Sequence, residues 1–494
     1  MTIALNEILN NILTPGQHVE FENAANTIPA QGHRILVIGM KLAAGTKAEN
    51  ELALITNENL GELYFGAGSM LDQMVRAAKR VDPDTELQAI GLDEEGGGAA
   101  AAGSVEFGGT ATAAGNVKLY IGGKLVDVPV AVGDGPTEIV ANAVTLITAD
   151  TSLPTSAADA DPELTVTCKW KGESGNGIDI RVNYYQSDSL PPGITATVTP
   201  MSGGTTDPTL QTAIDALGDQ QFHTVICGLT TTANLVILKD FLTERWGAMV
   251  QLEGMAFIAH TSLDGTTKAA AHAAALAFQT HNSAFLSIME GGLSPSLPWV
   301  WAAVTGAIDA KATQIDVNRP RQTTTMPGLL PARTEVEYNR AERQLLLEAG
   351  LATHYSVQGA AIVERLVTTY TTDNNGFPDT SLQDVIVLRA LSYIRFSLRV
   401  RTAQRYGQHK LARDSFVPPP GSRVARPKDI RAMIIALAVS DWVSKTIVQD
   451  LEALKEGLIV ELQDDDPATG RINARLPTKI IRALRVAAFQ VAFS

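Results

Sequence analysis

The most constraining feature of this chain is the regular alternation of helix-forming stretches with short apolar runs between residues 209 and 312. The predicted order is helix 209–217, strand 223–227, helix 232–246, strand 255–259, helix 266–280, strand 284–289 and helix 298–312. Strands that alternate with helices form a mainly parallel sheet with helices on both faces. The alternation therefore predicts an α/β core.

Two further strands, 33–40 and 86–92, are predicted upstream, separated by a helix that continues to Arg80. Ser69 stands where an N-cap is needed, because its hydroxyl can accept a hydrogen bond from the free amides of the first turn. These elements are expected to join the same core. The glycine-rich run at 93–98 predicts a flexible hinge and a domain boundary.

The segment after this hinge has the short alternating pattern of a β-rich inserted domain. Its predicted strands are 117–121, 125–130, 164–168 and 178–182, and one helix is predicted at 137–149. Gly122 and Gly123 indicate a tight hairpin between the first two strands.

The last quarter of the chain is predicted to be mainly helical. A helix at 379–406 is followed by a proline-marked loop at 418–421, a helix at 427–456 and an alternating strand near the end of 480–493. That strand has no hairpin partner after it. It is therefore expected to add to a sheet edge, either its own or a neighbour's.

Length and composition favour a folded, multidomain, intracellular protein. A chain of 494 residues predicts three or four domains, and 45% hydrophobic against 19% charged residues excludes general disorder. The two cysteines, Cys168 and Cys227, indicate a reducing compartment and no disulfide. Neither a signal peptide nor a membrane-spanning helix is expected.

Charge is distributed unevenly along the chain. The net charge is −14, yet residues 386–431 contain eleven Lys or Arg against two Asp, so this stretch carries +9 and the remainder −23. Such asymmetry predicts one surface for an acidic partner. The alternative is that several of these arginines pair with carboxylates elsewhere in the chain.

The predicted helix 379–406 carries the sharpest candidate surface, formed by Arg395, Arg399, Arg405 and the following Lys410. Direct binding of nucleic acid is disfavoured, because sites for single strands usually interleave aromatic residues with the basic ones and few are present here. Contact with another acidic partner and ion pairs within or between subunits are the two other interpretations.

Motifs for catalysis, cofactors or metals are incomplete. The turn at 66–69 lacks the third glycine of a dinucleotide site and the lysine of a P-loop, and Ser202 lacks the context of a nucleophile elbow. The eight histidines show no zinc spacing, and the acids at 464–466 are more typical of a solvated loop. We therefore expect no enzyme, no cofactor and no metal. A nucleotide-binding α/β enzyme is the remaining alternative from another class.

An ordered series of short motifs resembles one known family, the tail sheath proteins of contractile bacteriophages, and most closely those of Mu-like phages. The motifs lie at 14–21, 65–70, 330–332, 337–342, 345–347, 350, 363–365, 368–370, 375–379, 382–384, 393–395, 410–411, 420–421 and 427–428. Most of the chain is covered, and only about 95–200 matches loosely.

The resemblance implies a structural subunit that polymerises helically around a tail tube and contracts to drive the tube through a bacterial envelope during genome delivery. The implied partners are other copies of the chain in stacked hexameric rings, the tube protein, and baseplate and tail terminator proteins. No membrane insertion is implied. The implied location is the virion tail, after assembly in the host cytoplasm. A tailocin-like injection particle is the alternative setting.

The resemblance also implies terminal arms that add strands to neighbouring subunits, and a basic surface that faces the tube. The arm residues are Val19, Phe21, Leu484, Val486, Phe489, Val491 and Phe493, and the tube-facing residues are Arg395, Arg399, Arg405 and Lys410. The expected domains are an N-terminal arm 1–25, an α/β core 26–94 with 205–375, an inserted β-rich outer domain 95–204, an α+β inner domain 376–480 and a C-terminal arm 481–494.

Overall fold

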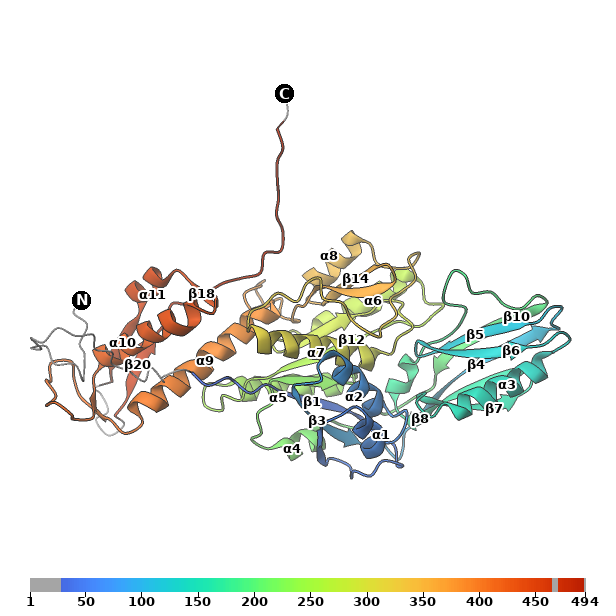
Figure 1. Cartoon of the computed structure of the whole chain (residues 1–494), viewed down its shortest axis with the longest axis horizontal. Helices are drawn as coiled ribbons and strands as arrows, with labels where there is room; N and C mark the ends of the chain where they lie inside the picture. Colours follow the sequence, from blue (N-terminus) through green and yellow to red (C-terminus); the bar gives the residue numbers. More distant parts are fainter. Residues whose placement is uncertain (1–27, 464–469, 493–494) are drawn as a thin grey trace, which may run out of the picture. The chain divides into compact units, whose positions relative to one another are not determined.

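The computed structural model describes residues 28–463 and 470–492, which form two compact units (Figure 1). The core unit is built from residues 32–393, 445–449 and 479–492. The small unit is built from residues 28–31, 394–444, 450–463 and 470–478. Each is described by itself below.

A six-stranded sheet forms the centre of the core unit, in the order β13-β12-β11-β1-β3-β2. Its strands are β1 Arg34–Met40, β2 Leu52–Ile55, β3 Glu86–Leu92, β11 Thr224–Cys227, β12 Met255–His260 and β13 Leu286–Glu290. All neighbours are parallel except β2, which pairs antiparallel with β3 at one edge. The predicted mainly parallel sheet is present, with β2 as an unpredicted edge strand.

Helices cover both faces of this sheet, as the order of its strands requires. They are α1 Asn59–Phe65, α2 Met70–Val81, α4 Gln211–Leu217, α5 Thr232–Trp246, α6 Lys268–Leu276 and α7 Pro298–Ile315. The chain moves one way across the sheet from β1 to β3 and the opposite way from β3 through β11 to β13. Right-handed crossovers therefore place α2 on one face and α4, α5 and α6 on the other. Helix α7 packs against α2 and shares its face.

The inserted segment folds into two antiparallel sheets, β10-β4-β8-β7 and β6-β5-β9, with α3 packed against strands of both. Its elements are β4 Ala100–Gly109, β5 Gly115–Ile121, β6 Lys124–Val130, α3 Pro136–Ala149, β7 Thr155–Ala160, β8 Glu163–Lys171, β9 Ile180–Val182 and β10 Ile194–Ser202, with a 3₁₀ turn at Glu173–Gly177. The β5–β6 hairpin is confirmed. Gly122 and Gly123 have φ of 58° and 81°, as a two-residue hairpin turn requires.

The predicted hinge at 93–98 lies between β3 and β4, and its first two residues make charged contacts. Asp93 forms an ion pair with Lys41 at 2.6 Å, and the Glu94 carboxylate accepts a hydrogen bond from the Lys171 amide at 3.0 Å. Beyond the hinge, the Trp170 ring lies 5.6 Å from that of Trp299 on α7. Charged and aromatic contacts thus hold the inserted segment against the sheet, although its glycine content resembles that of a linker.

The rest of the core unit contains a helix and two strand pairs. These are α8 Arg340–Glu348, the hairpin of β14 Thr353–Val357 with β15 Ala360–Arg365, and the short pair of β18 Val448–Gln449 with β21 Lys479–Ile480. Helix α8 begins in a capping box. Asn339 accepts from the Glu342 amide at 3.0 Å, and Glu342 accepts from the Asn339 amide at 2.7 Å.

Helix α9, Val385–Tyr406, starts in the core unit and ends in the small unit. It begins later than the predicted helix: Asp379 accepts from the Ser381 amide in a turn, and Asp384 accepts from the Ile386 amide at the start of the helix. The small unit continues with β16 Lys410–Leu411, β17 Val424–Ala425, α10 Pro427–Leu437, α11 Leu451–Gly457, β19 Ile459–Leu462 and β20 Ile472–Arg475.

The predicted continuous helix 427–456 is wrong. After α10 the chain forms a π-helical turn at Ala438–Val443, and Thr446 and Asp450 then adopt positive φ of 57° and 62°. The π-helical turn orients Trp442, which is fully buried and donates to Ser397 Oγ at 2.8 Å. No helix in the described part of the chain is both long and apolar enough to cross a membrane.

Candidate assembly surfaces

The topological switch point of the sheet, between β1 and β11, is filled by protein. Open parallel sheets bind nucleotides at this position, where the strand order reverses. Here the Met70 sulfur lies 3.1 Å from where a Cβ atom of Gly39 would be, and even closer to where one of Gly228 would be. Met70 and Met74 are both fully buried. This packing leaves a nucleotide no access to the crevice.

The start of α2 is likewise occupied by its own side chains. Ser69 Oγ accepts from the Asp72 amide at 3.0 Å, and the Asp72 carboxylate accepts from the Gly68 amide at 3.0 Å. Arg76 donates to the same carboxylate at 2.7 Å. The N-cap prediction is confirmed. An internal carboxylate stands where a phosphate would have to bind.

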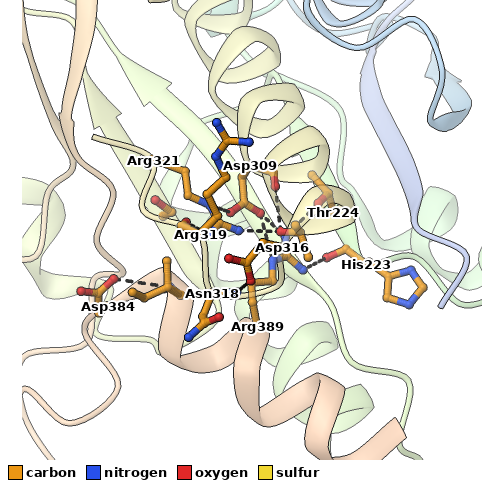
Figure 2. A network of polar contacts seen from close by, with 12 residues as sticks. His223, Thr224, Asp309, Asp316, Asn318, Arg319, Arg321, Asp384 and Arg389 are labelled. Carbon is orange, nitrogen blue, oxygen red and sulfur yellow. Dashed lines mark hydrogen bonds and ion pairs between the residues drawn. The ribbon is translucent and has the colours of Figure 1, made fainter. Parts of the chain in front are cut away.

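A buried ionic network joins α7, α9 and β11 (Figure 2). Asp309 is fully buried and accepts from Arg321 Nε at 2.9 Å and from Arg389 Nη2 at 2.5 Å. Arg389 also donates to the His223 carbonyl at 2.6 Å and to Thr224 Oγ1 at 2.8 Å. Two buried guanidinium groups therefore share one carboxylate. The remaining donors of Arg389 bind His223 and Thr224, and those of Arg321 bind Arg319 and Thr313 on α7.

This network changes the interpretation of the basic stretch, because several of its cations bind groups of their own chain. Arg389 is buried on Asp309, and Arg426 pairs with Asp429 at 2.8 Å. Lys428 and Arg431 donate to backbone carbonyls. The alternative, a carboxylate partner in another segment, is confirmed for Arg389, whose partner Asp309 lies on α7. The other three cations bind groups of their own chain but no described carboxylate outside the stretch.

The two histidines beside the network are held neutral. Burial, together with the charge of Arg389, lowers the pKa of His223 to about 3. Burial also lowers the pKa of His33, whose ring stacks on that of His223 at 4.9 Å. In the unfolded chain a histidine binds its proton near pH 6.5. As the pH falls below that value, the unfolded state binds more protons than the folded state, so stability decreases.

We expect His223→Gln to weaken this pH dependence. A histidine with a depressed pKa contributes a slope of about 1.4 kcal/mol per pH unit to the free energy of unfolding. A glutamine oxygen can still accept the hydrogen bond that Arg34 N donates to His223 Nδ1 at 3.3 Å. Urea unfolding between pH 6 and pH 4 should therefore give the variant a slope shallower by about 1 kcal/mol per pH unit. An unchanged slope would show that His223 is protonated in the folded protein.

The C-terminal arm is fixed to the core unit at its root. The Ile481 amide donates to the Ile447 carbonyl at 2.9 Å, and Gln322 donates to the Leu484 carbonyl at 3.0 Å. Arg485 binds Asp384, immediately before α9, through contacts of 3.0 Å and 2.8 Å. Residues 479–485 therefore form an anchor that includes the first residues of the predicted arm 481–494.

Beyond this anchor, residues 486–492 are extended and solvent-exposed (Figure 1). They form no helix, strand or hydrogen bond with any residue that the structure describes. The side chains of Leu484, Val486, Phe489 and Val491 are 74%, 76%, 88% and 83% exposed. Val486, Phe489 and Val491 thus lie on one exposed segment, and the exposed side chain of Leu484 lies just before it, in the anchor. Val19, Phe21 and Phe493 lie outside the described residues.

Comparison with known proteins identifies the family. The family model of the phage tail sheath protein central domain matches residues 203–369. The tail sheath protein of the Mu-like prophage FluMu of Haemophilus influenzae is 33% identical over 497 residues, which cover 100% of both chains. This chain belongs to the phage tail sheath protein family. The family assigned from the motifs is confirmed: it is a family of structural sheath proteins and not of enzymes, and this chain is a phage tail component.

Two solved sheath structures are similar at lower identity. The sheath tail protein of Desulfitobacterium hafniense is 11% identical, with a TM-score of 0.48 over 95% of this chain and 100% of that chain. The sheath of an extracellular contractile injection system, PVC, in its contracted state is 11% identical, with a TM-score of 0.49 over 97% of both chains.

The basic surface of this sheath protein lies on the second half of α9 and the start of β16, in the small unit. Arg399, Arg405 and Lys410 are exposed, whereas Arg395 is half-buried. Arg399 also lines an open recess of about 470 Å³ whose other walls include Leu398 and Tyr406. The four predicted residues therefore share one region, and a shallow apolar recess lies beside the charges.

Sequence reasoning missed the residues that anchor the arm. Asp384 was visible only as part of a family motif, and Gln322 had no signal of its own, because both act through contacts across more than a hundred positions of the chain. Cys168 and Cys227 are both buried and unpaired. In the described residues, no cluster of acids, histidines or cysteines could hold a metal ion.

Proposed function

We propose that this sheath protein polymerises helically around a tail tube and contracts, driving the tube through a bacterial envelope during genome delivery. The observation that carries the proposal is the anchored but unpaired arm at 486–492 of the described chain. An extended segment with exposed apolar side chains and unused main-chain groups is suited to strand addition. Such contacts are directional, so neighbouring subunits can stay connected while they rotate.

A sheet that could accept an arm is present in the small unit. Strands β19 and β20 pair only with each other among the described strands, so no described strand occupies either outer edge. An isolated two-stranded sheet is marginally stable in water. Ile459 on β19 is 51% exposed. We propose that arms of neighbouring subunits extend this hairpin into a larger sheet.

The proposed partners are other copies of the chain in stacked hexameric rings, the tail tube, and baseplate and terminator proteins, after assembly in the host cytoplasm. The proposed domains remain a core of 26–94 and 205–375, an inserted outer domain 95–204, an inner domain 376–480 and arms at 1–25 and 481–494. In this arrangement the basic surface of the inner domain faces the tube.

We expect charge reversal at Arg395 and Arg399 to weaken assembly on a tube more than self-assembly. Like charges placed opposite an acidic surface repel, and long-range attraction is lost as well. Arg395→Glu/Arg399→Glu should reduce tube-templated polymer by at least about tenfold at physiological salt. The matched control is Lys455→Glu/Arg471→Glu, which makes the same charge change elsewhere in the small unit. Equal loss with and without tube would point to contacts between sheath subunits instead.

Negative-stain electron microscopy of the purified protein, alone and with tail tubes, tests the proposed function. Hollow, regularly striated polymers would support a sheath. Monomers at high concentration in both conditions would contradict it.

A further inference from the structure

The core unit has a basic recess with an apolar floor on the α2/α7 face. It has a volume of about 330 Å³ and lies between the last turns of α2 and α7 and the chain at 319–327. Val81, Ile308 and Ile315 contribute to the apolar floor, and Ile315 is 64% exposed. The charged residues that line it are all cations: Arg80, Lys311 and Arg319.

Within the described chain, these three cations lack acidic partners. Lys311 donates to the Val81 carbonyl at 2.9 Å, and none of the three forms an ion pair with a described carboxylate. The protein has a net charge of −14, so its composition alone does not account for three cations without acidic partners around one apolar floor. They fit an occupant that is acidic and carries an apolar side chain.

The opposite face of the same sheet carries a surface of that chemistry. A groove of about 460 Å³ between α4 and α5 is lined by Asp215, Asp219, Asp240 and Glu244, with Arg245 as its one cation among the described residues. The Arg245 guanidinium donates to the carbonyls of Gly218 and Gln220 rather than to these acids. The carboxylates of Asp219, Asp240 and Glu244 form no ion pair within the described residues.

An apolar projection stands at the end of this acidic groove. Met249, in the turn after α5, is 95% exposed, more than any other large hydrophobic side chain in the described chain, and Val250 beside it is 43% exposed. Methionine is flexible enough to fill an irregular recess. The turn thus offers an apolar side chain next to acids, as the basic recess requires.

The basic recess and the acidic groove lie where they can meet between two copies of the chain, but not within a single copy. Helices α2, α4 and α5 all end just before a strand of the parallel sheet begins, so both surfaces lie near its amino-terminal edge, but on opposite faces. Complementary patches on opposite faces of one subunit make a head-to-tail contact that repeats from copy to copy. A polymer requires such a contact.

We propose that the Met249–Val250 turn of one sheath subunit inserts into the basic recess of the next. Asp240 and Glu244 then pair with Arg80, Lys311 and Arg319 of that neighbour. The inference rests on the proposed polymerisation and adds a second contact that is independent of the arms.

A charge exchange tests this contact. Arg80→Glu/Lys311→Glu and Asp240→Lys/Glu244→Lys, each made alone, should lower polymer yield by at least about tenfold, because like charges then oppose each other at the interface. The polymer yield of the chain that carries all four changes should recover to within about threefold of the wild-type yield, because opposite charges face each other again. Yields are compared by sedimentation and microscopy. The proposal is overturned if either double variant alone gives the wild-type polymer yield, or if the chain with all four changes does not recover its polymer yield.

Cysteine crosslinking gives a second readout that does not depend on the charged variants folding. Met249→Cys and Ile315→Cys replace exposed side chains, and the native Cys168 and Cys227 are buried. Mild oxidation of polymer that carries both changes should give a ladder of linked dimers, trimers and larger species, whereas each single variant gives none. Polymer without a ladder overturns the contact and leaves the sheath function intact. Failure of the wild-type chain to polymerise with or without tubes overturns both.

Discussion

Truncation after Arg485 should prevent polymer formation at concentrations at which the full-length chain assembles, and it should leave the subunit as stable as the full-length chain. The described residues beyond Arg485 make no hydrogen bond with the rest of the described chain, so their removal takes nothing from the folded subunit. In a polymer, burial of Val486, Phe489 and Val491 would contribute about 1.5–3 kcal/mol for each side chain, partly offset by the ordering of the arm. Since about 1.4 kcal/mol is a factor of ten, the critical concentration should rise at least about a hundredfold.

A full-length variant separates the effect of the length of the arm on polymer formation from the effect of its apolar side chains. Phe489→Ser/Val491→Ser removes two alternate apolar side chains and keeps the backbone, and Gln490→Ser changes the intervening residue. We expect Phe489→Ser/Val491→Ser to form as little polymer as the truncated chain, and Gln490→Ser to form as much polymer as wild type. Thermal unfolding checks that all three subunits are folded, and sedimentation measures polymer. Normal polymer from the truncated chain would exclude the arm as an assembly contact.

Asp309→Asn should be the most destabilising conservative substitution in the core unit. It leaves Arg321 and Arg389 buried without a counter-charge, and loss of one partner of a buried ion pair typically costs about 3–5 kcal/mol. The side chain keeps its size, so the loss is electrostatic and not a cavity effect. Urea unfolding should show the decrease in the free energy of unfolding.

Glu49→Gln is the matched control for this prediction. Glu49 is exposed and has no ion pair in the described chain, so neutralising it should change stability by less than about 0.5 kcal/mol. A combined Asp309→Asn/Arg321→Leu/Arg389→Leu variant would recover part of the loss if the buried charge is its cause. Equal stability of Asp309→Asn and wild type would mean that water or an ion compensates the two guanidinium groups.

Local patterns predicted the elements whose structure is set by nearby residues. The helix 232–246 and the strand 86–92 have the predicted bounds, because their apolar runs are long and end in clear breaks. The Ser69 cap and the Gly122-Gly123 turn follow from the chemistry of single residues. The parallel sheet followed from the alternation of elements.

The features that sequence reasoning missed depend on contacts between distant residues. Arg389 reads as one more cation of a basic stretch, and only the fold shows that it is buried on Asp309, 80 positions away. The π-helical turn at 438–443 interrupts a pattern that is otherwise helical throughout, because Trp442 is directed toward Ser397. The segment 93–98 has the composition of a linker, but its first two residues, Asp93 and Glu94, make charged contacts with Lys41 and Lys171. Composition alone cannot show such partners.

The anchor of the arm also defines a path for mechanical force. A pull on the arm reaches Arg485 first and passes through its two contacts to Asp384, at the entrance to α9. Arg389, in the second turn of that helix, then transfers the load to Asp309 on α7 and to Thr224 on β11. Tension between neighbouring subunits would therefore be carried into the rigid central sheet by charged contacts, and the exposed residues of the arm could act as a tether without unravelling the subunit that holds it.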